Sequence, residues 1–277
     1  MPVEWTGQSK SLSCDYGGWV IYKEYQRNHV IVPGREDALA SFLKQDYKGM
    51  KHKLKNAVSS NSEDALTWSC FDILASLPSL DKATALDEIL EDSFNGNAPL
   101  SLRSRGIGNN EISVHVGKQY TGISTKESTE VDASVEAPGV LVFFEAKLYS
   151  AVSPAAPPDK PHDQIARKLR VGLDSIVNGE REFFFVFLDL APADMMFQRK
   201  AKYEAVGRAG GGYGDKWRSA WLFQYYKVGR NKSLRPLAEA LQGIAHPPVD
   251  TVAARMGWLT WADLFKCTMR AALATRS

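Results

Sequence analysis

The sequence predicts an α/β fold in which helices surround a mixed sheet, and three observations lead to this prediction. Apolar residues recur with a helical period over residues 60–77. From residue 111 they alternate as in strands, and the alternation leads into the continuous apolar run 140–144. A helical stretch separates this run from a second one at 183–190, which is the order of a crossover between parallel strands.

The segment before this region is expected to contain one strand and one helix. The strand is predicted at residues 19–25 and the helix at about 36–55, where it ends in a run of basic residues that favours a solvated face. Ser60 and Glu63 have the spacing of a capping box, so the next helix is predicted to begin there. A shorter helix is expected at 83–94.

The strand region predicts a hairpin followed by a helix. Alternating apolar residues at 112–116 and 131–135 indicate two strands, and the run 140–144 indicates a third. Pro138 and Gly139 separate the last two strands and predict a turn between them. A helix is expected at about 163–177.

The remainder of the chain is expected to be mostly helical. Helices are predicted at 193–206, 234–244 and 249–274, with a strand at 219–228. The glycine-rich run 207–214 predicts a mobile loop. Trp258 and Trp261 fall in the last helical stretch and are interpreted as core residues.

The composition is that of a globular protein and does not indicate a particular function. The 277 residues are 44% hydrophobic and 24% charged, which is typical of globular proteins and excludes a disordered chain. No apolar run approaches the roughly 20 residues that cross a bilayer, and no secretory signal is visible, so no membrane contact and a cytoplasmic location are expected. Three widely spaced cysteines indicate neither a disulfide framework nor a zinc site. A net charge of +2 leaves a nucleic-acid partner open.

The residues that indicate chemistry lie in the predicted hairpin. Asp132 belongs to one strand and Glu145 lies near the end of the other, so the hairpin can bring both carboxylates together. Because strand side chains alternate, Glu145 and Lys147 project from the same face. Phosphodiester hydrolysis needs a hard cation, an attacking water and positive charge near the transition state, and two carboxylates with one lysine can supply these parts. Magnesium suits such an open oxygen site.

Asp132 followed by Glu145-Ala146-Lys147 resembles the motif of the PD-(D/E)XK nuclease superfamily, although Val131 stands where the family name has proline. The resemblance implies a restriction endonuclease-like αβββαβ core with a mixed sheet, plus N-terminal and C-terminal helical additions. The core would cover about 60–190 of a single α/β domain spanning 1–277, with an N-terminal extension 1–59 and a C-terminal segment 191–277.

The same resemblance assigns roles to further residues. Asp132 and Glu145 would hold Mg²⁺, with Mn²⁺ as a substitute, Glu63 would add a third acidic ligand, and Lys147 would serve catalysis. Gln164, Arg167 and Lys168 on the following helix would bind substrate. Each of these residues also has an interpretation without a functional role. Glu63 would be part of a helix cap, Gln164 a polar residue at a helix start, and Arg167 and Lys168 solvated helix charges.

The implied activity is metal-dependent hydrolysis of DNA, as by an endonuclease in restriction, repair or phage defence. Two alternatives stay open, which are a catalytically inactive nuclease-fold module for DNA binding or assembly, and an RNA nuclease. Whether the chain forms a homodimer or joins a partner protein is also open. The sequence has no HExxH, P-loop or GxSxG motif, which disfavours a zinc hydrolase, an NTPase and a serine hydrolase.

Overall fold

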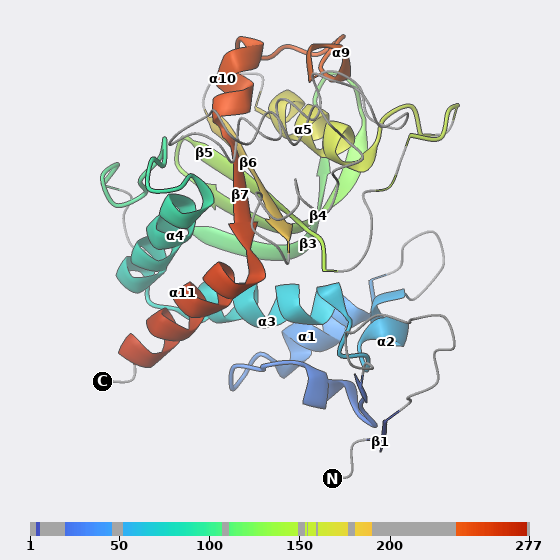
Figure 1. Ribbon diagram of the computed structural model, residues 1–277, viewed down its shortest axis with the longest axis vertical. Coiled ribbons are helices and arrows are strands. Elements are labelled where there is room, and N and C mark those ends of the chain that lie inside the picture. The colour runs from blue at the N-terminus through green and yellow to red at the C-terminus, as the bar shows by residue number, and fades with distance from the viewer. Residues whose placement is uncertain are drawn as a thin grey trace, which may run out of the picture.

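The structure is a computed structural model that describes residues 4–5, 20–45, 52–106, 111–148, 153, 155–158, 160–176, 181–189 and 237–275. A five-stranded mixed sheet lies at its centre, with the strand order β3-β4-β5-β6-β7 (Figure 1). The strands are β3 (Ser113–Thr121), β4 (Ser128–Ala137), β5 (Val140–Ala146), β6 (Glu182–Asp189) and β7 (Met256–Thr260). The first three pair antiparallel, and β5, β6 and β7 pair parallel. The prediction of an α/β fold with a mixed sheet is therefore confirmed.

Helices cover both faces of this sheet (Figure 1). On one face lie α3 (Glu63–Ser76), α4 (Ser79–Ser93) and α11 (Trp261–Ala274), packed around Phe71, Phe144 and Leu264. On the other lie α5 (Gln164–Asp174), α9 (Leu237–Ala240) and α10 (Val249–Ala254), packed around Phe143, Leu169 and Trp258. Every residue of β5 is buried, as the continuous apolar run requires of a strand covered on both sides.

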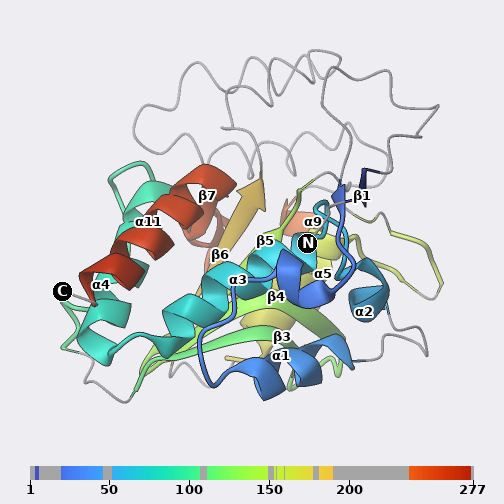
Figure 2. The ribbon, with the colours of Figure 1, turned by 90° about the horizontal axis from the view of Figure 1, so that it is seen from below.

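The N-terminal part is less regular than the sequence predicts. The expected strand at 19–25 is reduced to β2 (Val20–Ile21), which pairs with β1 (Glu4–Trp5) and precedes the 3₁₀-helix η1 (Tyr25–Asn28). The expected helix at 36–55 gives way to α1 (Glu36–Leu43) and α2 (His52–Asn56). Leu39 and Phe42 of α1 pack with Trp68 of α3, so this part rests on α3 beside the sheet (Figure 2).

The C-terminal segment corrects the prediction of purely helical additions. The helix expected at 249–274 is interrupted, because Met256–Thr260 forms β7 and pairs with β6. Trp258 is fully buried in that strand and packs against Phe187, which offsets any helical preference. Of the helix expected at 234–244, residues 237–240 form α9 and residues 241–244 lie outside any helix. Residues 234–236 and the elements expected at 193–206, 207–214 and 219–228 lie outside the described residues.

Cys70 and Cys267 are buried free thiols. In the part of the chain that the structure describes, no helix combines the length and the apolar character needed to cross a bilayer.

Candidate functional site

The candidate site begins where β4 and β5 separate. Their ladder runs from Ala137 opposite Val140 to Ala133 opposite Phe144, so Asp132 and Glu145 are the next residues on each strand. The amide of Ala146 donates to Asp132 Oδ2 over 2.8 Å. The Asp132 side chain therefore accepts an amide just past the end of the backbone ladder, and the expected approach of the two acidic residues is confirmed.

Lys147 lies beside Glu145, as strand alternation predicts. Its Nζ is 2.8 Å from Glu145 Oε1 and donates over 2.8 Å to the carbonyl oxygen of Ala146. Glu145 is fully buried and Lys147 is 6% exposed, which rules out an exposed cross-strand charge pair. Burial of an ionised group is costly unless it is paired, and here Glu145 and Lys147 pair with each other.

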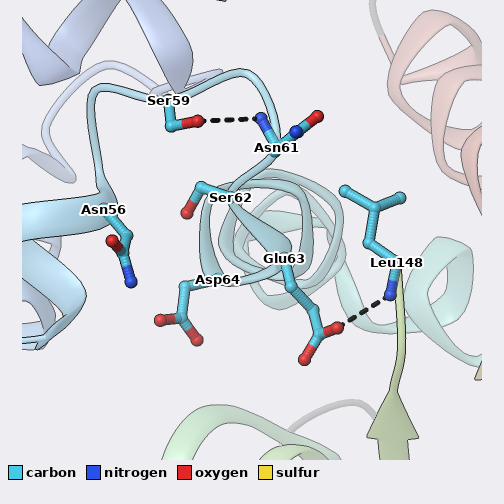
Figure 3. Close-up of a pocket in the computed structure, with 7 residues that line it drawn as sticks. All are labelled: Asn56, Ser59, Asn61, Ser62, Glu63, Asp64 and Leu148. Carbon is cyan, nitrogen blue, oxygen red and sulfur yellow. Dashed lines mark hydrogen bonds between the residues drawn. The ribbon is translucent and has the colours of Figure 1, made fainter. Parts of the chain in front are cut away.

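Glu63 reaches the same group of charges from α3. Its Oε2 accepts a hydrogen bond from the backbone amide of Leu148 at 2.7 Å (Figure 3). Its Oε1 is 3.4 Å from Lys147 Nζ. The predicted capping box at Ser60 is wrong, because Ser62 is the N-cap and accepts from the amide of Ala65. Glu63 is thus the first residue of α3 and is directed at the end of β5, where it joins the predicted site.

Lys168 belongs to this charge cluster more closely than the sequence predicts. Its Nζ forms ion pairs with Asp132 Oδ1, at 3.1 Å, and with Glu145 Oε2. Only 2% of its surface is exposed, so the interpretation as a solvated helix charge is wrong. Ile165 lies three positions before Lys168 and Gly172 four positions after it, so both share its side of α5, and both are buried. This helical period is the signal that could have placed Lys168 inside.

The surroundings shift the pKa values of these groups in opposite directions. Burial, together with the nearby charge of Asp132, raises the pKa of Glu145 to about 6. Burial alone would also raise the pKa of Asp132, but Lys168 and Lys147 outweigh it and lower that pKa. The carboxylates likewise outweigh the burial of the two lysines and raise their pKa values, so both ammonium groups stay protonated.

A polar cavity of about 370 Å³ opens beside Asp132. The predicted substrate residues Gln164, Arg167 and Lys168 all line it, and Gln164 Oε1 accepts from the amide of Ser153 at 3.1 Å. The Nε of Arg167 is buried and has no hydrogen-bond partner among the described residues. The other residues that line this cavity are Gln45, Lys53, Asp64, Gln119, Ser128, Thr129, Glu130, Ser153 and Lys160.

A second cavity, of about 520 Å³, lies at the start of α3 (Figure 3). Glu63, Asp64 and Leu148 line it together with small polar side chains, and Asp64 borders both cavities. Burial raises the pKa of Asp64 to about 6, and the nearby carboxylates of Asp132, Glu130 and Glu63 add to this rise. Sequence reasoning missed Asp64 because its neighbour Glu63 matched the expected pattern.

Two further residues support the site without having been predicted. Trp261, the first residue of α11, donates from Nε1 to the backbone oxygen of Lys147 over 3.0 Å. Lys53, from the basic run assigned to a solvated face, is 8% exposed and lies 2.5 Å from Glu130 Oε1. Both contacts join parts of the chain that are far apart in sequence.

The donor set of the site is limited to a few oxygens. Within the described ranges, no three His, Cys, Asp or Glu side chains meet closely enough to hold a metal ion by themselves. Asp132, Glu145 and the carbonyl oxygen of Ala146 lie at the end of the hairpin, and the Glu63 carboxylate, the third expected ligand, reaches Lys147 beside them. Magnesium commonly binds one or two carboxylates and keeps waters for its other positions, so this small set fits it.

Comparison of the chain with protein-family models, with curated proteins and with solved structures gave no significant match.

Proposed function

We propose that this chain is a metal-dependent nuclease of the PD-(D/E)XK type that hydrolyses DNA phosphodiester bonds. The observation that carries the proposal is the convergence of Asp132, Glu145 and Lys147 at the open end of the β4–β5 hairpin, beside a polar cavity. The order of α3, β3, β4, β5, α5 and β6 agrees with the αβββαβ core of that superfamily.

The residues have distinct roles in this proposal. Asp132 and Glu145 would hold the divalent cation with the Ala146 carbonyl, and Glu63 would assist through Lys147 and Leu148. Bound Mg²⁺ would act as a Lewis acid on the phosphate and would lower the pKa of a water molecule. The carboxylates keep Lys147 protonated, so its ammonium would stabilise negative charge on the phosphate.

The cavity supports a polyanionic substrate. Its lining includes four cationic side chains and three carboxylates, while the side-chain amides of Gln45, Gln119 and Gln164 provide neutral hydrogen-bonding groups. Guanidinium and ammonium groups bind phosphate oxygens without reading sequence. Substitution of Arg167 by methionine should therefore weaken binding to many DNA sequences alike and should reduce the dependence of affinity on salt.

A cleavage assay tests the activity. Purified protein is incubated with supercoiled plasmid, linear duplex DNA, single-stranded DNA and RNA, each with Mg²⁺, Mn²⁺ or EDTA. Metal-dependent cleavage of DNA that is lost in Glu145→Gln and Lys147→Met supports the proposal. The matched control is Glu136→Gln, since Glu136 is a β4 carboxylate that contacts Tyr120 and Lys118 instead. Cleavage restricted to RNA would favour the RNA nuclease alternative.

One observation favours the non-catalytic alternative. The two lysines already neutralise much of the charge on Asp132 and Glu145, as would suit a nuclease-fold module that binds DNA without cutting it. Salt-sensitive DNA binding together with no cleavage under any of the metal conditions would support this second function and overturn the first.

A further inference from the structure

The Lys168 ammonium occupies a shared position between two carboxylates that belong to different strands. Lys168 lies on helix α5, which packs on the sheet, and its ammonium reaches Asp132 Oδ1 on β4 and Glu145 Oε2 on β5. The lysine side chain is almost completely buried, so these carboxylates replace the water that the ammonium has lost.

The remaining oxygens of the two carboxylates are engaged elsewhere. Asp132 Oδ2 accepts the amide of Ala146, and Glu145 Oε1 contacts Lys147. The other oxygen of each carboxylate contacts Lys168, so the Lys168 ammonium pairs with both Asp132 and Glu145. A divalent cation that bridges Asp132 and Glu145 would need the place that the ammonium holds.

The charge balance leads to the same conclusion. When all groups are ionised, the carboxylates of Glu63, Asp132 and Glu145 face the ammonium groups of Lys147 and Lys168, which leaves one net negative charge. A divalent ion added to this cluster would reverse its sign. Without the charge of Lys168, two negative charges would remain, and a divalent ion would balance them.

We propose that Lys168 is an internal cation that competes with the divalent ion for Asp132 and Glu145, so that metal binding must displace it. This inference rests on the proposed metal site. Lys168 also lines the cavity beside Asp132, so a displaced ammonium has space there, next to the proposed path of the phosphates. Lys168 is a positioning residue in this scheme, because it sets when the carboxylates are available.

Calorimetry without nucleic acid tests the competition. Mn²⁺ is titrated into the wild-type protein, Lys168→Met, Lys147→Met and Lys118→Met. Coupling between two ligands typically changes affinity roughly 5- to 150-fold, and Lys168→Met should bind Mn²⁺ more tightly by a factor in this range. Lys147→Met removes the same charge but leaves the shared position filled, so its gain should be smaller. Lys118→Met is the control for the loss of a positive charge outside the site, since Lys118 pairs with Glu136, and it should match the wild type.

The outcomes separate this inference from the proposed function. Equal Mn²⁺ affinity in the wild type and Lys168→Met, with both binding at a site that Asp132→Asn removes, overturns the competition and leaves the metal site standing. Equal gains in Lys168→Met and Lys147→Met also overturn it, because total charge would then explain the effect. Absence of Mn²⁺ binding in every variant overturns the metal site and the competition together.

Amine labelling of the wild-type protein gives a test that does not depend on the folding of a variant. The protein is treated with an acetylating reagent in EDTA or in saturating Mn²⁺, and modified lysines are identified by mass spectrometry. Lys168 should be protected in EDTA and several-fold more reactive with Mn²⁺. Continued protection of Lys168 in protein that has bound Mn²⁺ overturns the proposal.

Discussion

Trp261 Nε1 donates to the backbone oxygen of Lys147 over 3.0 Å, and this bond ties the start of α11 to the residue that ends the acidic-x-lysine motif. The two residues lie 114 positions apart. The site therefore depends on the C-terminal segment as well as on the hairpin.

Replacement of Trp261 by phenylalanine should loosen this connection. The ring remains apolar, but the Lys147 carbonyl loses a buried donor, which should lower the free energy of unfolding by about 1–3 kcal/mol. Urea denaturation measures the loss. Trp258→Phe is the comparison, since Trp258 is buried against Phe187 in β7. Only Trp261→Phe should also weaken Mn²⁺ binding; equal Mn²⁺ affinity in both variants would argue against a link to the site.

The raised pKa of Glu145 predicts a pH dependence of stability. Between its ordinary value of 4.5 and about 6, the folded protein holds a proton on Glu145 that the unfolded chain has lost. The contribution of Glu145 to stability is therefore greatest below this window and falls as the pH rises through it, by about 2 kcal/mol.

Substitution Glu145→Gln removes this titration. Relative to the wild type, the variant should gain stability between pH 4.5 and pH 7, whatever its absolute stability after losing two ion pairs. Urea denaturation at both pH values checks the sign. A difference between the two proteins that does not change with pH contradicts the expectation.

Asp174 should show the opposite behaviour. Burial would raise its pKa, but hydrogen bonds from Ser124 and Thr125 outweigh burial and lower the pKa to about 2. Its contribution is complete above pH 3.8 and is lost as the pH falls toward 2. Asp174→Asn should cost about 2 kcal/mol at pH 7 and much less near pH 2. Acid titrations of the two proteins compare these losses; parallel curves would refute the expected role.

Gly172 provides a test of packing behind the site. An alanine in a helix interior normally stabilises it by about 1 kcal/mol relative to glycine. Here a Cβ would overlap the ring of Phe183, so Gly172→Ala should instead destabilise the protein by about 1–3 kcal/mol. Thermal unfolding measures the change, and the double variant with Phe183→Leu should recover part of the loss. A more stable Gly172→Ala would show that α5 is less closely packed on β6.

Local pattern was sufficient for the central elements. Alternation predicted the strands of the hairpin, and the continuous apolar runs predicted β5 and β6, because a strand covered on both faces has no polar side. The same alternation placed Glu145 and Lys147 on one face. The predicted pairing of the two hairpin strands placed Asp132 near them. These properties depend on residues close in sequence.

The tertiary structure decided what those residues contact. Lys168 became part of the acid cluster because α5 packs its inward face on β5, and β7 formed within an expected helix because it pairs with β6. Periodicity describes a single segment, whereas the cost of burying a charge and the gain from pairing a strand depend on which distant segment lies opposite. Sequence alone therefore determined the acids and the lysine of the motif, and only the packing of the layers decided that a second ammonium lies between those acids.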